Sequence, residues 1–197
     1  MGKKSVRIAV VRHGQKDGDA LTPLGERQIA AATKVLLGKV QFFRIAHSPF
    51  NRTTQCATIA QNIRNHAAVL VDKDVDGLSF KKPFAKAYDS NMQIYEEELA
   101  VIQANGNTVA AGMRVSKYAP LASQQLSDYL VSLAKDLQKH KEKCAICFSH
   151  SPYHTLAVPE ALADQFPYQG DEASCVLYTI TDGQITDAQY LPCPPVE

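Results

Sequence analysis

The sequence lacks several features that would assign it to a protein class at once. None of its apolar runs approaches the ~18 residues that a membrane-spanning helix needs. Its start is basic but has no long apolar region and no cleavage site, so we expect no signal peptide. The net charge is only +1, which disfavours nucleic acid and membrane surfaces as partners. No internal repeat or linker divides the chain, and we expect one globular domain over residues 1–197.

Cysteine is scarce, and its number is odd. Five cysteines without an export signal indicate reduced thiols and a cytoplasmic protein rather than a disulfide framework. Cys144 and Cys147 have the spacing of a redox or metal pair, but their apolar run predicts a strand, in which residues i and i+3 point to opposite faces. A second pair that would complete a zinc site is missing from the sequence. We therefore expect the cysteines to pack as small apolar side chains and to carry no redox or metal-binding function.

Short apolar runs alternate with helical patterns, which predicts an α/β fold with a mostly parallel sheet covered by helices. The expected strands lie at residues 6–11, 42–46, 68–71 and 144–148, followed by a terminal hairpin of residues 174–180 and 184–190 across Asp182-Gly183. The expected helices begin at Thr22-Pro23 and Ser48-Pro49, at residue 121 and after Ser151-Pro152. Residues 72–120 are expected to form an insertion, with an exposed loop at 81–86 and a helix at 92–104 that ends at Asn105-Gly106-Asn107.

Chemically useful side chains follow three of the predicted strands. Arg12 and His13 end the first, Arg52 lies in the first turn of the helix after the second, and His150 follows the strand at 144–148. Each has a simpler interpretation by itself: a loop segment, a solvated arginine, a capping histidine. Because ligands bind beyond the carboxyl ends of parallel strands, we expect these side chains to meet at one edge of the sheet. A helix N-terminus beside Arg52 favours an anion there.

The order of these motifs resembles a known family. Arg12-His13-Gly14, Leu21-Thr-Pro-Leu-Gly25, Ser48-Pro-Phe-Asn-Arg52 with Gln55, and Ser149-His150 are similar to motifs of the histidine phosphatase superfamily, the phosphoglycerate mutase-like proteins. The resemblance implies a three-layer α/β/α sandwich, a phosphohistidine intermediate, no metal and no cofactor. The Ser-Pro-Phe-x-Arg segment most resembles that of small bacterial phosphohistidine phosphatases.

The residue types fit phosphoryl transfer on chemical grounds as well. Arg12, Arg52 and a protonated His150 neutralise the phosphoryl oxygens before attack. His13 must be neutral at its attacking nitrogen, and a backbone carbonyl near Gly14 is expected to bind the other nitrogen. Water then attacks the phosphohistidine and regenerates the enzyme.

The general acid is where the sequence departs from the family's pattern. Mutase-like members carry a glutamate in a Leu-x-Glu setting, but here Leu78 is followed by Ser79 and Phe80. The acid-phosphatase branch has an aspartate after its second histidine, where this chain has Ser151. We take Asp76 as the first candidate for the acid, and then the glutamates of the insertion, Glu96, Glu97 and Glu98.

The missing glutamate bears on the substrate. The imidazole of a phosphohistidine leaves more easily than an alkoxide, so a phosphohistidine protein is a serious candidate beside a small phosphorylated metabolite. The sequence thus predicts a metal-independent phosphatase that acts on one of these two classes. A phosphoglycerate-mutase-type phosphotransferase and a non-catalytic phosphate-binding module remain alternatives. Of the other histidines, His154 is expected at the surface or in the pocket, and His66 and His140 in solvent.

Overall fold

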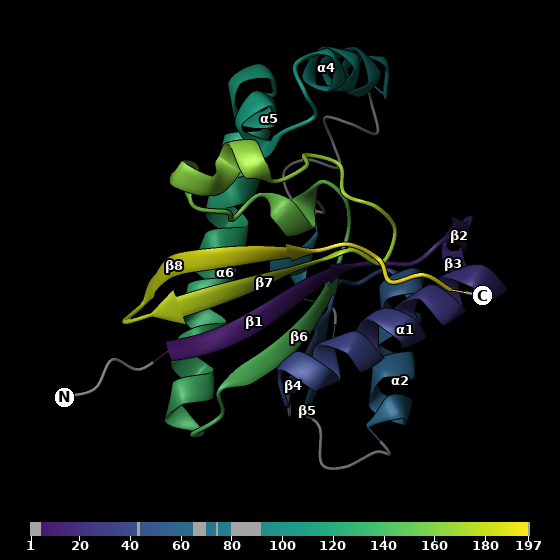
Figure 1. Cartoon of the computed structure of the whole chain (residues 1–197), viewed down its shortest axis with the longest axis vertical. Helices are drawn as coiled ribbons and strands as arrows, with labels where there is room; N and C mark the ends of the chain where they lie inside the picture. The colour runs from purple at the N-terminus through teal and green to yellow at the C-terminus, as the bar shows by residue number, and fades with distance from the viewer. Residues whose placement is uncertain (1–4, 43, 65–69, 74, 80–91, 197) are drawn as a thin grey trace.

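The computed structural model describes residues 5–42, 44–64, 70–73, 75–79 and 92–196. Its centre is a six-stranded sheet of order β5-β4-β6-β1-β7-β8 (Figure 1). Four neighbouring strands are parallel: β1 (Ser5–Arg12), β4 (Arg44–His47), β5 (Leu70–Asp72) and β6 (Cys144–Ser149). The last two, β7 (Cys175–Thr181) and β8 (Gln184–Leu191), form an antiparallel hairpin at one side. The predicted mostly parallel sheet and terminal hairpin are confirmed.

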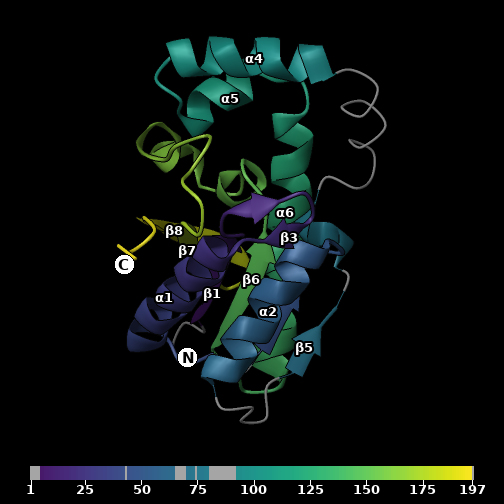
Figure 2. The same cartoon turned by 90° about the vertical axis from the view of Figure 1, so that its right-hand side faces the viewer.

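Helices cover both faces of this sheet and give three layers. Helices α1 (Pro23–Lys39) and α2 (Asn51–Ile63) lie on one face, and α6 (Ala119–Lys139) lies on the other (Figures 1 and 2). Side chains of β1 alternate between the two layers, since Val10 packs into the core beneath α6 and Val11 into the core beneath α1 and α2. This is the predicted α/β/α sandwich.

The described part of the predicted insertion lies beyond one end of the sheet. It contains a short 3₁₀ turn, η1 (Asp76–Leu78), and two helices, α4 (Met92–Ala104) and α5 (Val109–Val115), which sit past the end of α6 (Figure 2). Helix α4 ends where the sequence predicts, because Gly106 and Asn107 adopt φ values of 91° and 52°. The loop expected at 81–86, the first part of the strand expected at 68–71, and His66 lie outside the described residues.

Two predicted helix starts are wrong. The helix after β4 begins at Asn51 and not at Ser48-Pro49, because its N-cap is Phe50 and the Ser48 hydroxyl binds side chains, those of His150 and Thr53, instead of a backbone N–H of the first turn. After Ser151-Pro152 the chain forms two 3₁₀ turns, η2 (Tyr153–Thr155) and η3 (Glu160–Gln165), in place of an α-helix. Pro159 separates the two turns and supplies no backbone N–H to continue a helix.

Three local features follow the sequence closely. Thr22 caps α1 by accepting a hydrogen bond from the Gly25 backbone N–H at 3.1 Å. The β7–β8 turn has positive φ at both Asp182 and Gly183, as a two-residue hairpin requires. Gly14 is needed for close approach, because a Cβ there would overlap the Gly25 carbonyl, and this contact sets the turn after β1 against α1.

The cysteines and helices also agree with the sequence-based expectations. All five cysteines are free thiols, and Cys144 and Cys147 pack on opposite faces of the sheet. Burial raises the pKa of Cys56 and of Cys147 to about 12, so both thiols stay protonated at neutral pH. Among the helices that the structure describes, none is both long and apolar enough to cross a membrane.

Candidate active site

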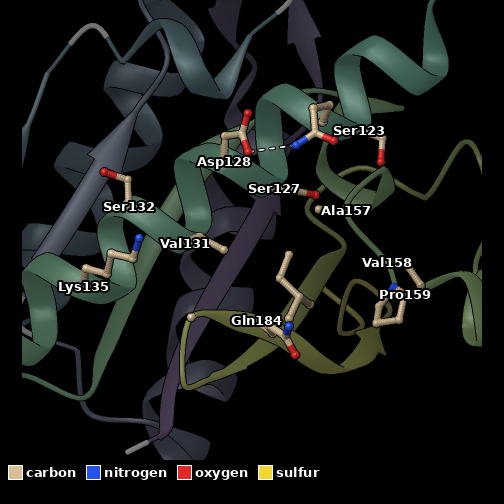
Figure 3. A pocket seen from close by; sticks show the side chains of 13 residues that line it. Ser123, Ser127, Asp128, Val131, Ser132, Lys135, Ala157, Val158, Pro159 and Gln184 are labelled. Atoms are coloured by element: carbon tan, nitrogen blue, oxygen red, sulfur yellow. Dashed lines mark hydrogen bonds between the residues drawn. The ribbon is translucent and has the colours of Figure 1, made fainter.

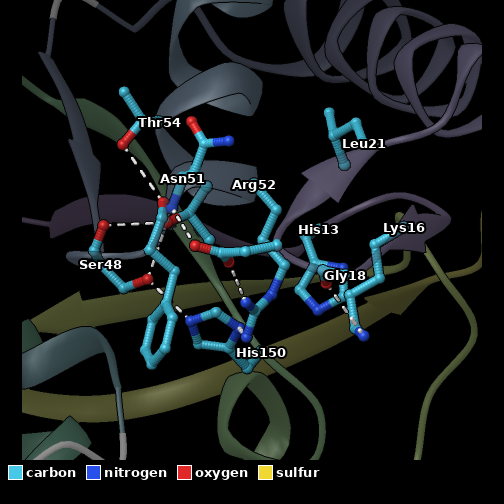
Figure 4. Close-up of polar contacts among 12 residues, drawn as sticks. His13, Lys16, Gly18, Leu21, Ser48, Asn51, Arg52, Thr54 and His150 are labelled. Carbon is cyan, nitrogen blue, oxygen red and sulfur yellow. Dashed lines mark hydrogen bonds and ion pairs between the residues drawn. The ribbon is translucent and has the colours of Figure 1, made fainter.

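The polar side chains predicted from three separate motifs meet at one edge of the sheet. Strand β6 lies between β4 and β1, so His150 at its end is next to the residues that follow both neighbours. The His150 ring centroid lies 5.3 Å from that of His13, and Nδ1 of His150 lies 3.2 Å from an Arg52 guanidinium nitrogen. Figure 4 shows these three side chains together, with Lys16 beside His13.

His13 has one fixed nitrogen and one open nitrogen. Its Nδ1 donates to the Gly14 carbonyl at 2.8 Å, as the sequence predicts, which leaves the Nε2 lone pair available. Among the described residues, Nε2 of His13 has no hydrogen-bond partner. The pKa of His13 is lowered to about 4, chiefly by burial and also by the cations of Arg52, Arg12 and Lys16, while the hydrogen bond to Gly14 opposes the shift. The ring is therefore neutral and nucleophilic at neutral pH.

His150 differs because both of its nitrogens are engaged. Nδ1 accepts from Arg52, so Nε2 carries the proton and donates to the Ser48 hydroxyl at 2.7 Å. Ser48 in turn contacts the Thr53 hydroxyl at 2.8 Å, which donates to the Phe50 carbonyl at 2.8 Å. Burial and the Arg52 charge hold the pKa of His150 well below its ordinary value. The His150 ring is therefore neutral in this structure, and a protonated His150 beside a bound phosphoryl group stays a prediction.

Arg52 lies in the first turn of α2, as predicted, and it is held from several sides. Its guanidinium stacks on the Phe50 ring at 4.4 Å from the ring centroid. One nitrogen contacts His150, and another forms an ion pair with Asp19. The Asp19 carboxylate also accepts from the backbone N–H of Asn51 at 3.2 Å. The guanidinium and the N-terminus of α2 thus present donors to an anion together.

Arg12 leaves the end of β1 toward the loop before β7. Its guanidinium donates to the Gly170 carbonyl, and the Ala173 backbone N–H donates to the His13 carbonyl at 3.1 Å. The charge of Arg12 reaches both histidines, since it lowers the pKa of each. Arg12 also lines an open, polar hollow of about 500 Å³ with Asn107 and Asp171 among its walls.

His154 supports this same loop and is not at the surface. It is fully buried, and its Nε2 lies 3.1 Å from the Ser174 hydroxyl, which donates to the Asp171 carbonyl at 2.6 Å. Burial lowers the pKa of His154 to about 3, so the ring is neutral. The surface alternative is wrong because the ring is fully buried, and one of its contacts comes from Ser174, twenty residues along the chain.

The acid candidates are less well placed. Asp76 is exposed on η1, and its backbone carbonyl accepts from the Gln125 amide at 3.0 Å. Among the described residues, its carboxylate has no hydrogen bond or ion pair with His13 or with the phosphate-binding candidates. Glu96, Glu97 and Glu98 lie on α4, at the far end of the molecule in Figure 2. Asp76 as the acid stays a prediction.

Sequence reasoning did not find the contacts of four residues with the site: Lys16, Asp19, Ser48 and Phe50. Asp17-Gly18 is a turn signal that could have indicated a hairpin, but no local pattern shows that its tip reaches Arg52. The Ser48-Pro49 pattern predicts a helix start and does not indicate the contact of Ser48 with His150.

A second hollow of about 580 Å³ lies elsewhere, between α6 and the turn of the β7–β8 hairpin. Figure 3 shows serines of α6 around it, and the Gln124 amide donates to Asp128 at 2.8 Å there. It contains none of the histidines or arginines of the cluster, so we place no phosphoryl chemistry in it.

Comparisons with known proteins identify the family of this chain. The family model described as the histidine phosphatase superfamily, branch 1, matches residues 8–186. A search of curated proteins gives no significant match.

Solved structures show the same fold at low identity. A phosphoglycerate mutase from Bacillus anthracis has a TM-score of 0.64 at 15% identity, covering 96% of this chain and 93% of its own. The protein histidine phosphatase SixA with tungstate has a TM-score of 0.57 at 16% identity, covering 94% of both chains. A mycobacterial glucosyl-3-phosphoglycerate phosphatase has a TM-score of 0.56 at 15% identity, covering 94% of this chain and 97% of its own. The chain belongs to branch 1 of the histidine phosphatase superfamily, whose structures include both phosphatases and mutases.

Proposed function

We propose that this protein is a metal-independent phosphatase that works through a phosphohistidine on His13. One observation carries the proposal: a neutral His13 imidazole is fixed through Nδ1 and has an open Nε2, in a cluster with His150 and with the guanidinium of Arg52 from the first turn of α2. A phosphate dianion repels nucleophiles, and these donors reduce its charge before attack. The first step needs a nucleophile with an available lone pair and positive donors that reduce the charge of the phosphate, and this arrangement supplies both.

The reaction has two steps. In the first, Nε2 of His13 attacks phosphorus, and the bond from phosphorus to the leaving group breaks. In the second, water attacks phosphorus, the P–N bond breaks, its electron pair returns to Nε2, and phosphate leaves. Arg12 and Arg52 bind the phosphoryl oxygens. A dianion beside the His150 ring favours its protonated form, which adds a third donor.

The substrate classes proposed are a small phosphorylated metabolite and a phosphohistidine protein. Two proteins of similar fold are named for these two kinds of substrate. One is a glucosyl-3-phosphoglycerate phosphatase, named for a small metabolite, and the other is a protein histidine phosphatase. The mutase alternative rests on the similarity to a phosphoglycerate mutase, and it needs a phosphohistidine that survives long enough to rephosphorylate the substrate. A cytoplasmic location remains the prediction from the odd number of cysteines, all of which are free.

A phosphatase assay tests the proposal. We expect hydrolysis of p-nitrophenyl phosphate that EDTA does not reduce. Arg52→Ala should lower kcat/KM by the factor that corresponds to a loss of about 2–4 kcal/mol in transition-state stabilisation. It should also weaken inhibition by inorganic phosphate. Arg27→Ala removes an exposed arginine from α1 and is the matched control. An inactive wild type that still binds phosphate would instead indicate a phosphate-binding module, and an unimpaired Arg52→Ala would remove Arg52 from the site.

A further inference from the structure

A small hairpin carries a carboxylate into the site. It consists of β2 (Lys16–Asp17) and β3 (Ala20–Leu21), and its turn contains Gly18, with φ of 56°, and Asp19. The hairpin is fixed to α2 at its base, because the Leu21 backbone N–H donates to the Gln55 side chain at 2.7 Å. Its tip therefore stays beside the first turn of α2, where Asp19 meets Arg52.

The Asp19 carboxylate lies next to the hydrogen-bond donors that we propose bind the phosphoryl group. It pairs with one guanidinium nitrogen of Arg52 and accepts from the Asn51 backbone N–H at 3.2 Å. Both are donors that an anion at the N-terminus of α2 would use. A phosphoryl group that binds Arg52 must therefore displace Asp19 or lie against it. Because the Leu21–Gln55 hydrogen bond holds the hairpin beside α2, a displaced carboxylate stays close to the phosphoryl group.

Asp19 is also able to exchange protons. Its side chain is 55% exposed, whereas that of Arg52 is 15% exposed, so water reaches the carboxylate from the open side of the site. Within the described residues, it is the one carboxylate that forms an ion pair with Arg52. When a phosphoryl dianion takes over the charge of Arg52, the carboxylate loses its cation and gains an anionic neighbour.

We propose that Asp19 is the catalytic acid and base that the Leu78-Ser79-Phe80 segment lacks. This inference rests on the proposed phosphatase function. As the P–N bond to His13 forms, the leaving oxygen takes the carboxyl proton of Asp19. The resulting carboxylate then accepts a proton from the water that attacks the phosphohistidine. Asp19 returns to its protonated form, and no other co-reactant is needed.

Two simpler roles for Asp19 make different predictions. A carboxylate that only blocks the anion site would slow every substrate, so its removal would speed every substrate. A carboxylate that only positions Arg52 would, when removed, slow every substrate by the same factor. An acid assists a poor leaving group more than a good one, so only this role changes the dependence of rate on leaving-group pKa. That dependence is the deciding readout.

The experiment measures kcat/KM for a series from aryl to alkyl phosphates on four proteins: wild type, Asp19→Asn, Asp19→Glu and Asp17→Asn. Asp17→Asn makes the same change at an exposed residue of the same hairpin and serves as the matched control. We expect a shallow leaving-group dependence in wild type and the control. Asp19→Asn should lose about 10²–10⁴-fold on alkyl phosphates and much less on aryl phosphates. Asp19→Glu, which keeps a carboxyl, should restore part of the alkyl rate.

Four results would overturn the role of Asp19: a steep dependence in wild type, an equal loss across the series in Asp19→Asn, a gain across the series, or no change. Asp76→Asn, made in parallel, would show the selective alkyl loss if Asp76 were the acid. Failure of the proposed function gives a different result. In that case the wild type would hydrolyse neither class, or His13→Ala would retain the wild-type rates.

Discussion

The two histidines that follow β1 and β6 have the same sequence setting and different surroundings. Each comes directly after a buried parallel strand, and the two are almost equally buried, with 5% of His13 and 6% of His150 exposed. His13 gives one nitrogen to a backbone carbonyl and leaves the other open. His150 gives both nitrogens to side chains, those of Arg52 and Ser48. Burial and strand position therefore do not distinguish the proposed nucleophile from the proposed binding residue, whereas the number of hydrogen-bonded ring nitrogens does.

The largest expected effect comes from exchanging the two histidines for alanine one at a time. His13→Ala should lose about 10⁴-fold or more in kcat and form no phosphoenzyme, because the nucleophile is gone. His150→Ala should still form the phosphoenzyme, at a lower rate, because Nε2 of His13 remains. Rapid-quench labelling with a phosphorylated substrate measures both, and His140→Ala controls for loss of an exposed histidine. Equal losses of phosphoenzyme in the two variants would remove the distinction.

A smaller effect should follow when the hydroxyl next to His150 is removed. Ser48→Ala leaves the buried Nε2–H of His150 without its acceptor, which costs about 1–2 kcal/mol. We expect kcat/KM to fall about 5–30-fold while the identity of the phosphorylated residue is unchanged. Ser132→Ala removes a hydroxyl from an exposed position of α6 and should have no effect. Wild-type kinetics in Ser48→Ala would show that the Ser48–His150 contact does not hold the ring for catalysis.

The smallest effect concerns stability and pH. Between about pH 4 and the ordinary histidine value of 6.5, the unfolded chain binds a proton on His13 that the folded chain does not. The free energy of unfolding therefore falls as pH is lowered through this window. His13→Gln removes this proton-binding difference. The free energy of unfolding of the variant, relative to that of wild type, should therefore be about 1–2 kcal/mol higher at pH 5 than at pH 8. Urea unfolding at the two pH values measures this, and an equal difference at both would contradict it.

The sequence predicted the strands and the residues at their ends because both depend on local patterns. An apolar run specifies β1 or β6, and the residues directly after it must emerge at the carboxyl edge, which brought His13, Arg52 and His150 together correctly. The Gly14 carbonyl could be predicted as the partner of His13 because it is only one residue away in the sequence. The Asp182-Gly183 hairpin was predictable for the same reason.

The partners that distinguish the two histidines were not predictable, because they come from distant parts of the chain. Asp19 reaches Arg52 across 33 residues, and Ser48 reaches His150 across 102. The neutral state of His150 follows from burial and from the Arg52 charge, neither of which a strand-end motif specifies. The same holds for His154, whose burial depends on the loop that carries Ser174.

The most direct test of this account is the position of phosphorus on the trapped phosphoenzyme. Two-dimensional ¹H–¹⁵N and ³¹P NMR of the denatured, phosphorylated protein distinguishes the two imidazole nitrogens, and peptide mapping identifies the histidine. Because Nδ1 of His13 is bonded to the Gly14 carbonyl and Nε2 is open, the account predicts phosphorus on Nε2 of His13 alone. Phosphorus on Nδ1 of His13, or on His150, would contradict it.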